Sequence, residues 1–219
     1  MRWFTVRPLM ALLSLSLPAA LPVPTLVGRA LQRLHQGQPE VASKVITHVD
    51  VYDGKGAFLG SLETVAALAS WTKDGKPVRK EIASHQQGSP GFTMSLSLHL
   101  EDSPAEALDG FDTWSEAGPA DLQGQPVRRF RGISVSGKET TVALAYLDPQ
   151  TGAPLQVDYE MPVHSTFGTR QVKATVRFGP GAGGAWVPRS ATLDQAGRVM
   201  FWSRHLVVVS TYQDWVPRP

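Results

Sequence analysis

Glycines and serines at two places have spacings close to those of nucleotide-binding and catalytic proteins. Residues 179–184 (GPGAGG) match the G-x-G-x-x-G pattern of a dinucleotide-binding loop and follow a predicted strand. Such a loop must open a helix whose N-terminus binds the pyrophosphate, whereas residues 185–188 (AWVP) contain a proline and continue as a strand. Residues 132–137 (GISVSG) lack the G-x-S-x-G spacing of a nucleophile elbow and also lie in a predicted strand. We therefore expect a hairpin loop at 179–184 and no nucleophilic serine.

Histidines and carboxylates are the other side chains that could act on a substrate or bind a metal. The six histidines occur singly, without H-x-H or H-E-x-x-H spacing, so we expect them to face solvent. Glu101, Asp102, Asp109 and Asp112 lie in a predicted loop, where a solvated surface explains them and a glycosidase pair is the alternative. The sequence thus predicts a protein that is not an enzyme and that binds no metal and no cofactor.

Arg128, Arg129 and Arg131 form the only dense basic cluster in the chain. On a strand, Arg129 and Arg131 share one face, and Arg128 shares the other face with Phe130. A charged outer surface is the default interpretation; docking to an acidic envelope protein or a transient contact with lipid headgroups is the alternative. Residues 1–20 hold two arginines and no acid, which leaves 19 basic and 19 acidic residues in the rest of the chain. This balance argues against nucleic-acid binding.

The N-terminus has the layout of a secretory signal peptide. Arg2 and Arg7 form a positive region, residues 9–17 are apolar, and residues 18–20 (PAA) are a small-residue exit. We therefore predict a signal peptide at 1–20 and one domain at 21–219. A membrane anchor at 9–27 is the alternative, which Pro18, Pro22 and Pro24 disfavour because proline breaks helical hydrogen bonding.

The residue usage fits an exported bacterial protein. The absence of cysteine excludes disulfides, thiolate metal sites and lipid attachment at an N-terminal cysteine. The chain has no asparagine, and arginine outnumbers lysine. We take this bias as a sign of a GC-rich bacterial genome and predict the periplasm as the compartment.

Beyond the N-terminus, the hydrophobic pattern predicts one helix and many strands. Thr25 is a candidate N-cap for a helix at 25–36, with apolar residues at helical spacing. Period-two strands are predicted at 45–51, 59–71, 78–84, 92–100, 127–136, 140–147, 154–161, 169–178, 185–193, 198–205 and 206–214. Residues 101–126 read as a loop-like insertion, partly helical at 104–108. Because the loops are short, we predict a mainly β fold: a curved antiparallel sheet or incomplete barrel of about 10–11 strands with few helices.

Two groups of apolar residues are expected to line a cavity behind this sheet. Strand 92–100 alternates strictly between apolar and polar side chains. Residues 148–152 are expected to join a hairpin in which Leu147 pairs with Leu155. This pairing places the small residues Ala143 and Ala145 beside Tyr159 and Val157, which leaves unfilled space on that face of the sheet. The N-terminal helix or an apolar ligand could fill that room. The predicted lining residues are Phe92, Met94, Leu96, Leu98, Ala143, Ala145, Val157, Tyr159 and Met161.

Three segments resemble the C-terminal half of LolA/LolB-like periplasmic proteins: residues 147–155 (LDPQTGAPL), 184–189 (GAWVPR) and 212–215 (YQDW). That group includes lipoprotein carriers and receptors and the sensor domains of envelope-stress regulators. The resemblance implies an incomplete antiparallel barrel of about eleven strands that wraps over helices and encloses a cavity for acyl chains. We therefore expect a periplasmic protein that binds a lipid, acyl chain or other apolar ligand, in lipoprotein or lipid trafficking. The alternative is an envelope interaction or sensor module whose core is filled by its own side chains.

Overall fold

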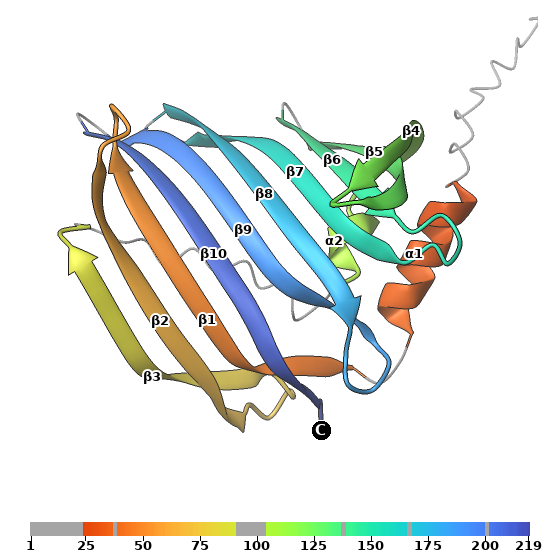
Figure 1. Cartoon of the computed structure of the whole chain (residues 1–219), viewed down its shortest axis with the longest axis horizontal. Helices are drawn as coiled ribbons and strands as arrows, with labels where there is room; N and C mark the ends of the chain where they lie inside the picture. Colours follow the sequence, from red (N-terminus) through yellow and green to blue (C-terminus); the bar gives the residue numbers. More distant parts are fainter. Residues whose placement is uncertain (1–23, 37–38, 91–103, 137–138, 166–167, 200–201) are drawn as a thin grey trace, which may run out of the picture.

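A computed structural model describes residues 24–36, 39–90, 104–136, 139–165, 168–199 and 202–219. This part of the chain forms one ten-stranded antiparallel sheet and two helices (Figure 1). The helices are α1 (Thr25–His35) and the short α2 (Glu106–Asp109). The strands are β1 (Glu40–Asp53), β2 (Phe58–Trp71), β3 (Pro77–Gly88), β4 (Thr113–Leu122), β5 (Gln125–Ser136), β6 (Glu139–Leu147), β7 (Pro154–Ser165), β8 (Gly168–Pro180), β9 (Trp186–Val199) and β10 (Trp202–Pro217).

The strand order is β3-β2-β1-β10-β9-β8-β7-β6-β5-β4, so two meanders meet where β1 pairs with β10. Strands β3 and β4 form the two edges, and the described residues do not join them, so the sheet is open. The predicted fold class, a mainly β antiparallel sheet with an N-terminal helix and little other helix, is therefore confirmed. The strand number, ten over the described residues, falls within the predicted range.

Cross-strand register defines the two faces of the sheet, because directly opposed residues of antiparallel strands point to the same side. We call the face that packs against the helices the inner face. One row of direct partners crosses nine strands on it: Leu62, Val49, Val208, Leu193, Ala174, Tyr159, Ala143, Gly132 and Trp114. The adjacent row on the opposite, outer face includes His48, Glu63, Val209, Thr192 and Asp158.

Helix α1 packs its apolar stripe on the inner face. Val27, Ala30 and Leu34, at helical spacing, are buried. They join a core, here called the helix core, that also includes Leu108, Trp114, Phe130, Ala143, Ala145, Leu147, Val157, Val176, Phe178, Val187, Ala191, Tyr212 and Trp215. The helix therefore seals this part of the sheet from solvent.

The turn between β6 and β7 lies directly against α1. Gly152 has a φ of +71°, and a Cβ on it would sit 2.7 Å from Cβ of Arg29, so a larger residue does not fit there. Arg33 Nε donates a hydrogen bond to the carbonyl oxygen of Thr151 at 3.3 Å. The predicted N-cap was wrong: Thr25 is the first helical residue, Pro24 occupies the N-cap, and no side chain caps the helix.

Three sequence-based expectations need correction in the strands. Residues 113–122 form strand β4 rather than a loop; its alternation is hidden by a bulge between Glu116 and Gly118, which breaks the period of two. Residues 198–205 are not a separate strand, because β9 runs to Val199 and β10 begins at Trp202. Leu147 pairs with Pro154 rather than with Leu155, since the register shifts after Tyr146.

Ala145 tests how tightly α1 closes the helix core. Its side chain is fully buried, so Ala145→Leu forces added volume against a packed interior, and we expect a loss of about 1–3 kcal/mol in the free energy of unfolding. Urea unfolding measures this. The matched control is Ala196→Leu on an exposed position of β9, for which we expect a change within about 0.5 kcal/mol. Equal effects of the two variants would contradict close packing under α1.

Candidate functional site

The predicted cavity-lining residues fall into three groups. Phe92, Met94, Leu96 and Leu98 lie outside the described residues, and of Met161 only the backbone position on β7, opposite Val172, is described. The other four form the predicted cross-strand pairs, Ala143 with Tyr159 and Ala145 with Val157. Ala143, Ala145 and Val157 have no exposed surface and belong to the helix core, together with Val27, Ala30 and Leu34 of α1. That the nine residues line a ligand cavity stays a prediction.

Tyr159 marks the boundary between two halves of the inner face. Its ring packs against the helix core and also against a second apolar cluster. The hydroxyl donates a hydrogen bond to the carbonyl oxygen of Ala107 in α2 at 2.8 Å, and the ring stacks on Phe111 with 6.2 Å between centroids. Burial, and secondarily the charge of Asp158, raises the pKa of Tyr159, so it stays a neutral donor. The residue thus ties α2 to the sheet.

The second apolar cluster, here called the strand cluster, lies on the inner face beyond Tyr159 and contains no residue of α1 or α2. Leu59 and Leu206 pack against it, and Leu62, half-buried, continues its row on β2 beside Val49. Figure 1 shows β1, β2 and β3 on the side of the sheet away from both helices. The strand cluster consists of Val49, Val51, Val172, Ala174, Leu193 and Val208.

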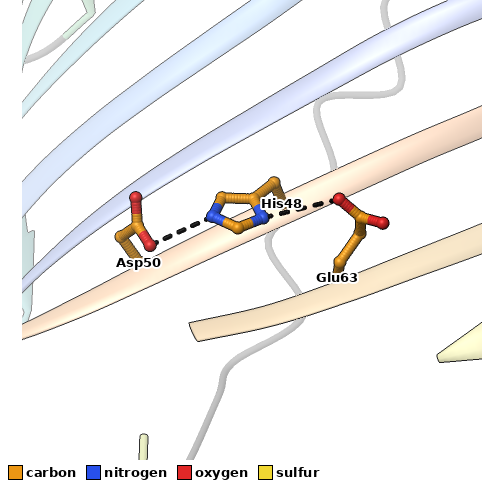
Figure 2. A network of polar contacts seen from close by, with 3 residues as sticks. All are labelled: His48, Asp50 and Glu63. Atoms are coloured by element: carbon orange, nitrogen blue, oxygen red, sulfur yellow. Dashed lines mark hydrogen bonds and ion pairs between the residues drawn. The ribbon is translucent and has the colours of Figure 1, made fainter. Parts of the chain in front are cut away.

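The outer face carries histidine and carboxylate pairs. His48 lies between two carboxylates (Figure 2): its Nε2 is 3.1 Å from Asp50 Oδ1 and its Nδ1 is 3.7 Å from Glu63 Oε2. His205 Nε2 is 2.7 Å from Asp194 Oδ1. Because Asp50 and Glu63 contact opposite ring nitrogens of His48, the three side chains cannot converge on one metal ion. No group of three or more such ligands could hold a metal among the residues that the structure describes.

The sequence did not lead us to predict that His48 and His205 pair with carboxylates. His48 and Asp50 are two residues apart on a strand and therefore share a face, a signal that the sequence did contain. Glu63 and Asp194 come from neighbouring strands, so only the register reveals them. The side chains of His48 and His205 are 41% and 37% exposed, in keeping with the predicted solvent-facing positions.

The three arginines do not act as one surface. Register confirms the predicted split: Arg129 and Arg131 lie on the outer face opposite Tyr146 and Leu144, and Arg128 shares the side of Phe130. Arg128 forms an ion pair with Glu116. Arg129 donates to the carbonyl oxygen of Ala117 at 3.2 Å. Partner docking through these residues stays a prediction.

The glycine-rich segment 179–184 ends strand β8 with Gly179 and Pro180, and its residues 181–184 lie in the predicted hairpin loop between β8 and β9. It encloses a carboxylate of the chain itself. Glu40, at the start of β1, is buried and accepts a hydrogen bond from the backbone N–H of Gly183. A Cβ at Gly181 or Gly183 would collide with this carboxylate. The contact with Glu40 therefore explains why glycine is needed at these two positions, and no bound nucleotide is required to explain it.

No protein-family model matches the chain, and no curated protein matches it. Solved structures similar to it include a DUF1329 family protein from Desulfovibrio piger, with 13% identity, 90% of this chain and 93% of that chain covered, and a TM-score of 0.44. An outer membrane lipoprotein-sorting protein domain from Vibrio parahaemolyticus has 10% identity, coverage of 87% and 91%, and a TM-score of 0.40. The MucA/MucB complex of Pseudomonas aeruginosa matches at 11% identity, coverage of 89% and 98%, and a TM-score of 0.26.

Among the described residues, neither helix has the length and apolar character needed to cross a bilayer.

Tyr159→Phe tests the tie between α2 and the sheet. Removing the hydroxyl leaves the buried carbonyl oxygen of Ala107 without its donor, so we expect a loss of about 1–2 kcal/mol in the free energy of unfolding. Urea unfolding measures it. Tyr52→Phe, at a less buried position on β1, is the control and should change stability by less than about 0.5 kcal/mol. An unchanged stability of Tyr159→Phe would show that the hydroxyl contact does not hold α2.

Proposed function

We propose that this protein binds a lipid, acyl chain or other apolar ligand on the inner face of its sheet, over the strand cluster, and performs no reaction on it. One observation carries the proposal: the apolar row of the inner face continues from Tyr159 to Leu62, whereas the helices pack only on the other half. Five strand spacings of about 4.8 Å make this stretch roughly 24 Å long, enough for an extended alkyl chain. Each buried methylene contributes about 0.8 kcal/mol.

The predicted signal peptide places this function outside the cytoplasm, in the periplasm of a bacterium. A soluble protein that covers an alkyl chain would move lipids or lipidated proteins through that aqueous compartment. Expression of the full chain in a bacterial host tests the location. We expect a periplasmic product whose N-terminus begins after a cleavage site; a full-length product retained in the membrane would favour the anchor.

The helix core supports a second candidate, an envelope interaction or sensor module. Ala143, Ala145 and Val157 are buried in one core with residues of α1, which supports a core filled by the chain's own side chains in this half of the inner face. In that case a protein partner would contact the outer face, where Arg131 is exposed. Solvent extraction and mass spectrometry of the purified protein separate the candidates, since a co-purifying lipid supports the first and its absence favours the second.

A pair of variants on β2 tests the binding face. Leu62 and Val65 are both half-buried, but Leu62 lies on the inner face beside Val49 and Val65 on the outer face beside Ile46. A charge against a bound alkyl chain must be desolvated, so Leu62→Glu should weaken the binding of a fluorescent fatty acid about tenfold or more. Val65→Glu should leave affinity within about twofold. Circular dichroism and melting temperature confirm folding; equal losses in both variants would exclude the inner face as the binding site.

A further inference from the structure

Gln195 is a buried amide whose cross-strand neighbours on the inner face are apolar. It lies on β9, and 6% of its surface is exposed to solvent. Its direct cross-strand partners are Leu206 on β10 and Val172 on β8, and the next residue in the row, on β1, is Val51. All three partners belong to the strand cluster or pack against it. The amide therefore sits on the surface over which we place the ligand.

The carbonyl oxygen of this amide, Oε1, is buried and has no hydrogen-bond partner. Buried acceptors are normally paired, because an unpaired one has lost its water without compensation. Ser210, a buried polar residue two rows away on the same face, follows this rule, since its hydroxyl lies 3.3 Å from that of Thr47. Gln195 is thus a polar group that the described chain leaves unsatisfied.

We propose that Gln195 Oε1 accepts a hydrogen bond from the ligand, an inference that rests on the proposed function. The ligand is then an amphiphile that carries a hydroxyl or amide N–H next to its alkyl chain. A neutral amide suits a neutral donor, because the apolar neighbours of Gln195 would penalise a buried charge. A site built around a hydrogen bond also discriminates strongly against analogues that lack the donor, which leave its acceptor unpaired.

Two matched probes test the inference: 1-dodecanol, which has a hydroxyl donor, and methyl dodecyl ether, which has the same chain and no donor. Each displaces a fluorescent fatty acid from the purified mature protein. We expect dodecanol to bind about three- to tenfold more tightly, the factor that one neutral hydrogen bond supplies. Gln195→Met keeps the side-chain length and removes the amide, so it should abolish the preference.

The melting temperature of Gln195→Met should equal or exceed that of the parent, because the variant removes an unpaired buried acceptor. Thr192→Val, on the outer face of β9, is the control and should keep the preference for dodecanol. Equal affinities of the parent for the two probes, or a preference that survives in Gln195→Met, would overturn the inference while leaving the proposed function standing. Failure of every probe to bind would overturn the proposed function and the inference with it.

Discussion

The pairing of β1 with β10 is the constraint on which the rest of the structure depends. It joins a strand near the N-terminus to the last strand, in register from Glu40 opposite Pro217 to Asp53 opposite Arg204. Without it the chain would form two separate meanders, each with one more unpaired edge, and backbone polar groups at such edges must find other partners. With this pairing, the inner-face row that runs from β4 to β10 continues onto β1 and β2 through Val49 and Leu62.

The inner face divides into the helix core and the strand cluster. Small residues on β6, Ala143 and Ala145, belong to the same buried core as Ala30 of α1. Beyond Tyr159, the strand cluster contains no residue of either helix. Close packing holds α1 against one part of the inner face, and the ligand that we propose would lie over the other part.

Polar groups on the two faces have different consequences. The pairs of His48 and His205 with carboxylates are partly exposed, so water competes with them and each contributes little to stability. Gln195 lies among apolar neighbours, where a single unpaired oxygen is costly. For this reason the inner amide, rather than the more numerous outer charges, points to recognition of a ligand.

Local pattern in the sequence was sufficient for the fold class, for α1 and for most strands, since a period of two or of 3.6 reports on one element at a time. It was also sufficient for the pairing of Ala143 with Tyr159, because a short turn sets the register of a hairpin. Strand β4 was not predicted, because its bulge interrupts the alternation of apolar and polar residues by which a strand is recognised in a sequence. Only the tertiary structure decided that β1 lies beside β10, that Ala145 shares a buried core with α1, and that Gln195 lies on the same face as the strand cluster. These outcomes depend on contacts between residues far apart in the chain, whose packing and register no local periodicity encodes.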